Sequence, residues 1–219
     1  MKGISITRSR RVESEEDRVK ALAVLGRTYA EEKGWVLDVS GMFPASDLGR
    51  TDISWFLATK SGEPIGVLRV VYDPSLGGYG AGGYHLENVD PSLDIGKFMA
   101  ANRIAEIGRF AVVPERRKGV GVVLSLMRAS TKEIVRLGYT QLITDVFEND
   151  PHSPLGFHTR VIGFKKVATH EVGELHHKGR RITLLLDIKL GYRNLKLRGN
   201  RFFRAVTRGW TPAMHDSLA

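Results

Sequence analysis

The sequence predicts an α/β domain built on a mixed sheet with helices covering its faces. Apolar segments of strand length alternate along the chain with segments that repeat at helical spacing, and turns rich in glycine or proline separate them. The resulting order is β, α, β, β, β, α, β, α, β, β, and it contains no internal repeat. Neighbouring strands that form hairpins, together with strands joined across a helix, give a mixed sheet.

The first half of the chain predicts one helix and three strands. Ser14 suits a helix N-cap because carboxylates occupy positions 15–17, near the positive end of the helix dipole. We expect this helix to end near Lys33-Gly34. Strands are expected at Ile4–Thr7, Ile53–Thr59 and Ile65–Tyr72, the last two as an antiparallel hairpin.

The second half predicts four more strands and two helices. Gly138 is a natural helix stop, and the glycine-rich segment 77–83 predicts a loop. The expected strands are Ile104–Val113, Gln141–Phe147, Phe164–Val172 and Arg181–Ile188, and the expected helices are Val120–Leu137 and Pro154–Ile162. We expect one domain over residues 1–190 and a basic, aromatic tail over residues 191–219.

Composition excludes several classes of protein. The 219 residues are 42% hydrophobic and 26% charged, no run reaches the roughly 20 apolar residues of a spanning helix, and the N-terminus does not resemble a signal peptide. We therefore expect a cytoplasmic protein. The absence of cysteine excludes a disulfide framework, a thiolate metal site and a cysteine nucleophile.

The net charge of +9 favours an anionic partner. Much of the excess lies in the tail, where residues 189–210 hold seven basic side chains and no acidic one. Leu195, Phe202, Phe203, Val206 and Trp210 fall near one side of a helix there, which is typical of an interfacial membrane helix. The tail could instead dock on the domain, on a second subunit or on RNA, and the inner face of the membrane is the alternative location.

Segment 106–122 carries the most informative pattern. A predicted strand runs into a basic turn, Arg116-Arg117-Lys118, and Gly119 and Gly121 then lead directly into an apolar helix. Glycine exposes backbone N–H groups, and a helix N-terminus adds partial positive charge, so this arrangement predicts a phosphate or pyrophosphate site reinforced by the three cations. The Walker and dinucleotide-binding glycine patterns are both absent.

Arg116-x-x-Gly119-x-Gly121 resembles the acyl-CoA-binding motif of the GNAT acyltransferase superfamily, R/Q-x-x-G-x-G/A. The resemblance covers about residues 3 to 188 and implies a mostly antiparallel sheet with splayed fourth and fifth strands. It implies that backbone N–H groups from Arg117 to Val122 hold the pyrophosphate of an acyl-thioester donor. It also implies that the strand segment Phe110, Ala111, Val112 and Val113 holds the pantetheine arm, and that Val120 lies within the phosphate loop.

A second resemblance concerns acyl-homoserine lactone synthases and long-chain N-acyl amino acid synthases, which take fatty acyl chains from acyl carrier protein. It rests on Tyr29 with Trp35, Gly66-x-x-Arg69 and Glu106-x-x-Arg109-Phe110. It implies a fatty acyl donor, carried by CoA or by acyl carrier protein, and an amino acid acceptor. The acidic carrier suits the basic chain.

Glu106 is the candidate general base, because an amine must be neutral to attack a thioester carbonyl. The alternative is a structural carboxylate paired with Arg69, Arg103 or Arg109. Arg69 and Arg109 could equally hold a substrate carboxylate by bidentate hydrogen bonds. Tyr29 and Trp35, with Phe98 and Met99, could line an acyl or acceptor pocket or belong to the core.

Superfamily members often carry a tyrosine as general acid at the position of Thr159, so His158 or a water is the candidate substitute. A backbone N–H at or beside Val112 could polarise the thioester carbonyl. The His and Glu residues of segment 170–177 do not have the spacing of a metal site, and we expect them to be structural or solvated.

The sequence thus predicts an N-acyltransferase working by direct attack, with a fatty acyl chain passed to an amino acid as the preferred reaction. The alternatives are an acetyl-CoA-dependent N-acetyltransferase of a small amine or protein, and a non-catalytic membrane-binding or nucleic-acid-binding module on the same scaffold. The donor is the only cofactor expected, with no metal.

Overall fold

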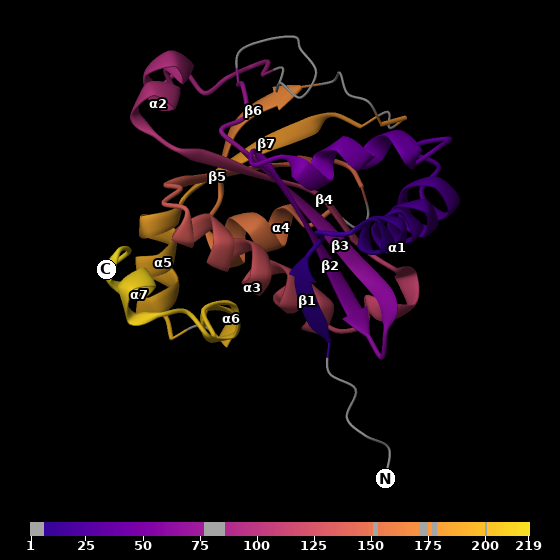
Figure 1. Cartoon of the computed structure of the whole chain (residues 1–219). Helices are drawn as coiled ribbons and strands as arrows, with labels where there is room; N and C mark the ends of the chain where they lie inside the picture. The colour runs from indigo at the N-terminus through magenta and orange to yellow at the C-terminus, as the bar shows by residue number, and fades with distance from the viewer. Residues whose placement is uncertain (1–6, 77–85, 151–152, 171–174, 177–178, 200) are drawn as a thin grey trace.

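A mixed seven-stranded sheet forms the centre of the protein in a computed structural model, which describes residues 7–76, 86–150, 153–170, 175–176, 179–199 and 201–219 (Figure 1). The strand order is β1-β2-β3-β4-β5-β7-β6, and every neighbouring pair is antiparallel except β4 and β5. The strands are β1 (Arg8–Arg11), β2 (Ile53–Lys60), β3 (Glu63–Tyr72), β4 (Ile104–Val112), β5 (Gln141–Phe147), β6 (Lys165–His170) and β7 (Arg181–Asp187). The predicted fold class is confirmed.

Helices cover both faces of this sheet. The α-helices are α1 (Glu15–Leu25), α2 (Ile95–Ala101), α3 (Gly121–Arg136), α4 (Leu155–Phe157), α5 (Ile188–Leu197), α6 (Arg201–Val206) and α7 (Pro212–Asp216). Tighter or wider helical turns are η1 (Gly26–Glu32), η2 (Ser40–Met42), η3 (Ala45–Gly49), η4 (Pro114–Arg116) and η5 (His158–Ile162).

Two faces of the sheet can be told apart by their side chains. On the face that we call the α3 face, a Cβ atom added at Gly66 would lie 2.7 Å from Val122 Cγ1 of α3, so glycine is what lets this helix approach β3. We call the opposite face the Glu106 face. It carries Trp55, which stacks on Phe43 with ring centroids 4.1 Å apart, and α1 reaches it where Arg18 Nη1 donates to the Phe43 carbonyl.

Several local predictions are confirmed by the backbone. Ser14 caps α1 by accepting a hydrogen bond from Asp17 N at 3.2 Å. Ser61 and Gly62, with φ of 52° and 83°, form the two-residue turn of the β2–β3 hairpin. Gly138 ends α3 with φ of 77°.

The first helical segment ends near Lys33-Gly34 as predicted but changes its winding on the way, and the first strand differs from the prediction. The α-helix ends at Leu25 and continues as the π-helical turn η1, where the Thr28 hydroxyl donates to the carbonyls of Val24 at 2.8 Å and Leu25 at 3.3 Å and so competes for helix acceptors. The first strand is β1, later than the predicted segment 4–7, of which residues 4–6 lie outside the described residues. The predicted loop 77–83 also lies outside them.

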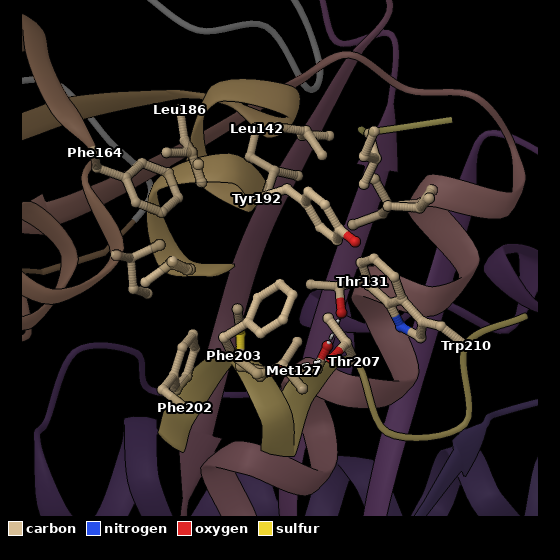
Figure 2. Close-up of a pocket in the computed structure, with 18 residues that line it drawn as sticks. Met127, Thr131, Leu142, Phe164, Leu186, Tyr192, Phe202, Phe203, Thr207 and Trp210 are labelled. Atoms are coloured by element: carbon tan, nitrogen blue, oxygen red, sulfur yellow. Dashed lines mark hydrogen bonds between the residues drawn. The ribbon is translucent and has the colours of Figure 1, made fainter. Parts of the chain in front are cut away.

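The tail folds into α5, α6 and α7, which lie beside α3 (Figure 1). Of the alternatives left open for its aromatic side, the structure has docking on the domain: Phe202 packs on Phe157 with centroids 5.4 Å apart, and Phe203 packs on Tyr192 at 5.2 Å. Figure 2 shows Tyr192, Phe203 and Trp210 pointing into the space above α3. The apolar side of the tail thus covers part of the α3 face, and the basic side remains at the surface.

An apolar cavity of about 80 Å³ remains beneath these helices (Figure 2). An apolar cavity of about 150 Å³ is what holds a benzene molecule in a protein core. The space under the tail is therefore a packing defect without room for a long acyl chain. Among the described residues, no helix has both the length and the hydropathy of a membrane span.

Candidate active site

The parallel pair β4 and β5 separates after a short ladder. Ile104, Ala105 and Glu106 pair with residues 141–143, and no later residues of these two strands pair with each other. Thr144 Oγ1 donates to the Ile107 carbonyl at 2.7 Å where the strands diverge. Beyond that point β4 continues to Val112 and β5 to Phe147, so a gap opens in the sheet. We call this gap the fork, and it confirms the predicted splay.

A bulge bends β4 along one side of the fork. Arg69 pairs with Gly108 and Val67 with Ala111, so Leu68 lies opposite two residues, Arg109 and Phe110. Arg109 takes a φ of 48°, a left-handed conformation that is uncommon for a residue with a Cβ atom. A bulge of this kind redirects a strand and is frequent next to active sites. Here it turns segment 110–113, the predicted binder of the pantetheine arm, along the gap.

The predicted phosphate loop forms one wall of a shallow hollow that also borders the β2–β3 hairpin, at the end of the sheet where β4 leads into α3. The hollow has a volume of about 250 Å³, and its walls include Lys60, Lys118, Gly119 and Gly121. None of the hydrogen bonds between described residues uses the backbone N–H of Gly119, Val120, Gly121 or Val122 as donor. Val120 provides no side-chain cap for α3. These N–H groups, which we call the amide cradle, therefore remain available to an anion.

The cradle fits the phosphate groups of a thioester donor by a second criterion. A Cβ atom added at Gly119 or Gly121 would meet no protein atom within 4 Å, so the space above both glycines is open. Glycine is not needed there for protein packing. It leaves room for a ligand to approach the backbone closely.

Two of the three cations that we expected to reinforce the loop already have carboxylate partners. Arg116 Nη2 lies 2.9 Å from Glu63 Oε2. Arg117 binds Glu32 at 2.5 Å and donates to the Val112 carbonyl at 2.7 Å, so it ties the loop to β4. Lys118 has no ion pair among the described residues, and it lines the hollow together with Arg116 and Glu115. Arg116 and Arg117 would have to break these ion pairs before their guanidinium groups could bind a donor phosphate.

Glu106 lies on β4 at the closed end of the fork. Its Oε1 and Oε2 are 3.1 and 3.4 Å from Arg69 Nη2, and the two side chains are 10% and 21% exposed. A methyl group at Gly108 would clash with Glu106 Oε1, so this glycine gives the carboxylate its space. Three arginines were considered as ion-pair partners of Glu106, and the structure pairs it with Arg69. Arg103 instead lies 4.1 Å from the Tyr139 ring, and Arg109 is half-buried at the bulge.

Tyr29 and Trp35 lie near the far end of β5. The Trp35 ring contacts Tyr29 with centroids 5.3 Å apart and Phe147 at 4.9 Å. Phe147 points to the Glu106 face, because it lies four residues after Ile143, the partner of Glu106. The structure therefore brings both predicted aromatic residues to the face that carries Glu106. Phe98 and Met99, on α2, pack near Ile104 and Ile143.

His158, predicted as a substitute general acid, lies in buried surroundings. Burial lowers its pKa to about 4, its Nδ1 has no hydrogen-bond partner among the described residues, and its ring packs on Phe164 at 5.2 Å. The imidazole is neutral at pH 7 and holds no proton suited to protonating a leaving thiolate. Burial therefore argues against His158 as the general acid, and this role stays a prediction. Thr159 does not replace it, since its hydroxyl donates to the Leu155 carbonyl at 2.8 Å.

Asp145 on β5 was missed in the sequence. It is the only acidic residue of the strand Gln141–Phe147, and a carboxylate within an otherwise uncharged buried strand needs a partner or a ligand. The single acidic residue in this buried strand could therefore have been singled out from the sequence. Its partners, His170 and Thr183, are distant in sequence and could not be assigned without the sheet. Among the described residues, no group of three or more His, Asp or Glu side chains could hold a metal ion.

The family model of the N-acyl amino acid synthase FeeM matches residues 21–178, a span that includes the fork, the amide cradle and the Glu106–Arg69 pair. The chain belongs to the FeeM family. It is an N-acyltransferase, and the non-catalytic alternative is not retained. No curated protein sequence matches the chain.

Solved structures support the same fold. The structure of FeeM, an N-acyl amino acid synthase from uncultured soil microbes, matches with a TM-score of 0.65 and 16% identity, over 90% of this chain and 100% of FeeM. Aminoglycoside acetyltransferase AAC(6′)-Ib in complex with coenzyme A matches with a TM-score of 0.56 and 19% identity, over 87% and 99% of the two chains. A GNAT-family protein from Desulfovibrio desulfuricans matches with a TM-score of 0.50 and 15% identity, over 83% and 98%. The chain thus has the GNAT fold.

Proposed function

We propose that this member of the FeeM family transfers a fatty acyl group from a thioester donor to the amino group of an amino acid. The observation that carries the proposal is the fork itself, with the Glu106–Arg69 pair at its closed end and the amide cradle at its mouth. A donor whose phosphate lies on the cradle and whose arm follows segment 110–113 would bring its thioester to the closed end.

The proposed reaction is direct attack by the amine. Glu106 takes a proton from the acceptor ammonium, the neutral nitrogen forms a bond to the thioester carbon, and the carbon–sulfur bond breaks; the second proton that the nitrogen loses goes to the departing thiolate, which leaves an amide and a free thiol. Arg69 holds the carboxylate in place. A backbone N–H at or beside Val112 polarises the carbonyl oxygen. The chain has no cysteine, so an acyl-cysteine intermediate is excluded.

The donor is acyl-CoA or acyl carrier protein, since both present a phosphate followed by the same arm. The basic tail supports the acidic carrier: Arg193, Lys196, Arg198, Arg201, Arg204 and Arg208 are all exposed. Anionic lipid is the alternative occupant of that basic surface. Transfer of an acetyl group from acetyl-CoA is the alternative reaction.

Product identification is the direct test. Cells that make the wild-type chain should accumulate N-acyl amino acids detectable by mass spectrometry, and cells that make Glu106→Gln should not. In vitro, the purified protein should use fatty acyl-CoA or fatty acyl carrier protein in preference to acetyl-CoA, and comparing these donors identifies the carrier.

Glu106→Gln should lower kcat at least 100-fold while CoA binding, measured by calorimetry, stays within a factor of three, since the base is removed and the cradle is untouched. An unchanged kcat would remove Glu106 as the base. Accumulation of acetylated products alone would favour the acetyltransferase alternative.

A further inference from the structure

A second carboxylate lies on the Glu106 face, on the other side of the fork. Asp145 Oδ1 accepts a hydrogen bond from Thr183 Oγ1 at 2.9 Å, and Asp145 Oδ2 lies 2.7 Å from His170 Nε2. The His170 side chain is only 5% exposed, whereas Asp145 keeps 19% of its side-chain surface exposed. Neighbouring strands thus hold a carboxylate that still reaches solvent.

The strand register fixes where this carboxylate lies relative to Glu106. Glu106 pairs with Ile143, and Asp145 is the next residue of β5 on the same face. Strand spacing and rise place the two Cα atoms roughly 8 Å apart, or somewhat more as the strands diverge. One carboxylate therefore lies on each side of the fork.

The surroundings of Asp145 have the character of a binding site for an amphipathic amine. Toward the closed end of the sheet, Ile143 packs with Ile104 and with residues of α2. Toward the open end, Phe147 packs on Trp35. The Asp145 carboxylate thus lies between two apolar groups of side chains, one around Ile143 and one around Phe147.

The hydrogen bonds of Asp145 hold its carboxylate from the β6–β7 side, and part of the side chain stays exposed to solvent. An isolated buried carboxylate is costly, and here Thr183 and His170 each satisfy one oxygen from the β6–β7 side. Each carboxylate oxygen has a second acceptor position. These positions are what an ammonium group in the fork would use, through charge-assisted hydrogen bonds.

We propose that Asp145 binds the amino group of the acceptor and that His170 and Thr183 are positioning residues that orient its carboxylate. The inference rests on the proposed function, because it names the group that holds the amine for that reaction. Asp145 receives the acceptor as an ammonium ion and directs its nitrogen across the fork toward Glu106, which takes the proton. Asp145 itself exchanges no proton.

Binding measurements test this without turnover. The probes are L-phenylalanine, phenethylamine, which lacks the carboxylate, and 3-phenylpropionate, which lacks the amine; their ring suits the aromatic side of the site. Saturation-transfer NMR on the wild type should detect phenylalanine and phenethylamine more strongly than 3-phenylpropionate. The opposite order, or no binding of either amine, would overturn the proposal even if no variant folds.

Asp145→Asn should weaken binding of both amines at least tenfold and raise the acceptor KM by a similar factor, with the donor KM unchanged. His170→Gln and Thr183→Val should have smaller effects in the same direction, with kcat changed less than KM. Glu148→Gln is the matched control, because Glu148 lies just beyond β5 and pairs with Arg180 at 2.7 Å. Equal effects of Asp145→Asn and Glu148→Gln, or an unchanged acceptor KM in Asp145→Asn, would refute the assignment.

The two proposals fail separately. If the wild type acylates amino acids and Asp145→Asn keeps its acceptor KM, only the role of Asp145 is wrong. If the wild type binds amines through Asp145 but forms no N-acyl amino acid from any donor, the proposed function is wrong.

Discussion

At the scale of a single residue, burial determines the charge state of the His158 side chain. Its position, near that of a general acid in related enzymes, made it a candidate from the sequence. Desolvation lowers its pKa to about 4 because the low-dielectric surroundings penalise the charged ring. The His158 ring packs against Phe164, and a ring that stays neutral at pH 7 is a poor proton donor.

The same depressed pKa predicts a pH dependence of stability. In the unfolded chain the pKa of histidine is about 6.5, so the unfolded state takes up a proton first as the pH falls. The contribution of His158 is therefore complete above pH 6.5 and is lost as the pH falls toward 4, by about 1.4 kcal/mol per pH unit and at most about 3 kcal/mol in total. Urea unfolding at several pH values should show this loss.

His158→Gln separates this effect from that of the carboxylates, which also titrate in acid. The variant should be less stable at pH 7 but should lose less free energy of unfolding between pH 6.5 and 4.5 than the wild type. Parallel pH profiles of the two proteins would show that the His158 ring is not desolvated in the folded state.

At the scale of an element, the amide cradle consists of consecutive residues, so substitutions within it test its role in binding. Gly119→Ala combined with Gly121→Ala should weaken binding of CoA at least tenfold, because methyl groups would fill the open space above the backbone N–H groups. Neither glycine has a positive φ, so the fold should tolerate the change and the melting temperature should stay within a few degrees. Calorimetry with CoA measures the loss.

Gly49→Ala is the control for the cradle variant, since Gly49 lies in η3 and a Cβ atom there also meets open space. This control should bind CoA like the wild type. Undiminished CoA affinity in the double variant would show that the donor phosphates bind elsewhere.

Elements specified by nearby residues could be predicted from the sequence. The β2–β3 hairpin, β4, β5 and α3 lie close to their predicted bounds, because alternation, helical spacing and turn residues are all local signals. α2 was not predicted. It is short, contains Gly96, and has no buried residue to give a periodic pattern, although Asp94 caps it by accepting from Lys97 N at 3.0 Å.

The candidate site also has parts that could be predicted from the sequence and parts that could not. The cradle could be predicted because its residues are consecutive. The pairing of Arg69 with Glu106 was one of several open alternatives, and the sheet register decided among them. The Asp145–His170–Thr183 group could not be predicted, because β7 lies between β5 and β6 in the sheet, and nothing in the sequence indicates that order.

At the scale of the whole molecule, the tail is part of the core. Gly191 lies against Leu186, with an added Cβ atom only 3.0 Å from Leu186 Cδ1, so α5 can approach β7. Gly199 and Gly209, with φ of 59° and 82°, follow helices as turns. Arg128 of α3 donates to the Ala205 carbonyl at 2.8 Å and fixes α6 in place.

Removing an aromatic anchor of the tail should destabilise the whole protein. Phe203→Ala should lower the free energy of unfolding by about 2 to 4 kcal/mol, because it enlarges a cavity that already exists beneath the tail. Leu197→Ala is the matched control: Leu197 is 86% exposed on α5, and its loss should cost less than about 0.5 kcal/mol. Equal effects in urea unfolding would mean that the tail is detached in solution.

The short β4–β5 ladder has a mechanical consequence. Strands β1 to β4 and strands β5 to β7 are each broadly hydrogen-bonded, but only residues 104–106 and 141–143 join the two groups along the ladder. The seam is therefore the compliant part of an otherwise stiff sheet, and a ligand arm bearing amides, laid in the gap, acts as a substitute strand that braces both halves. Amide hydrogens along β4 and β5 should then exchange more slowly with the donor bound. The exchange rates of these two strands would therefore report how much donor is bound.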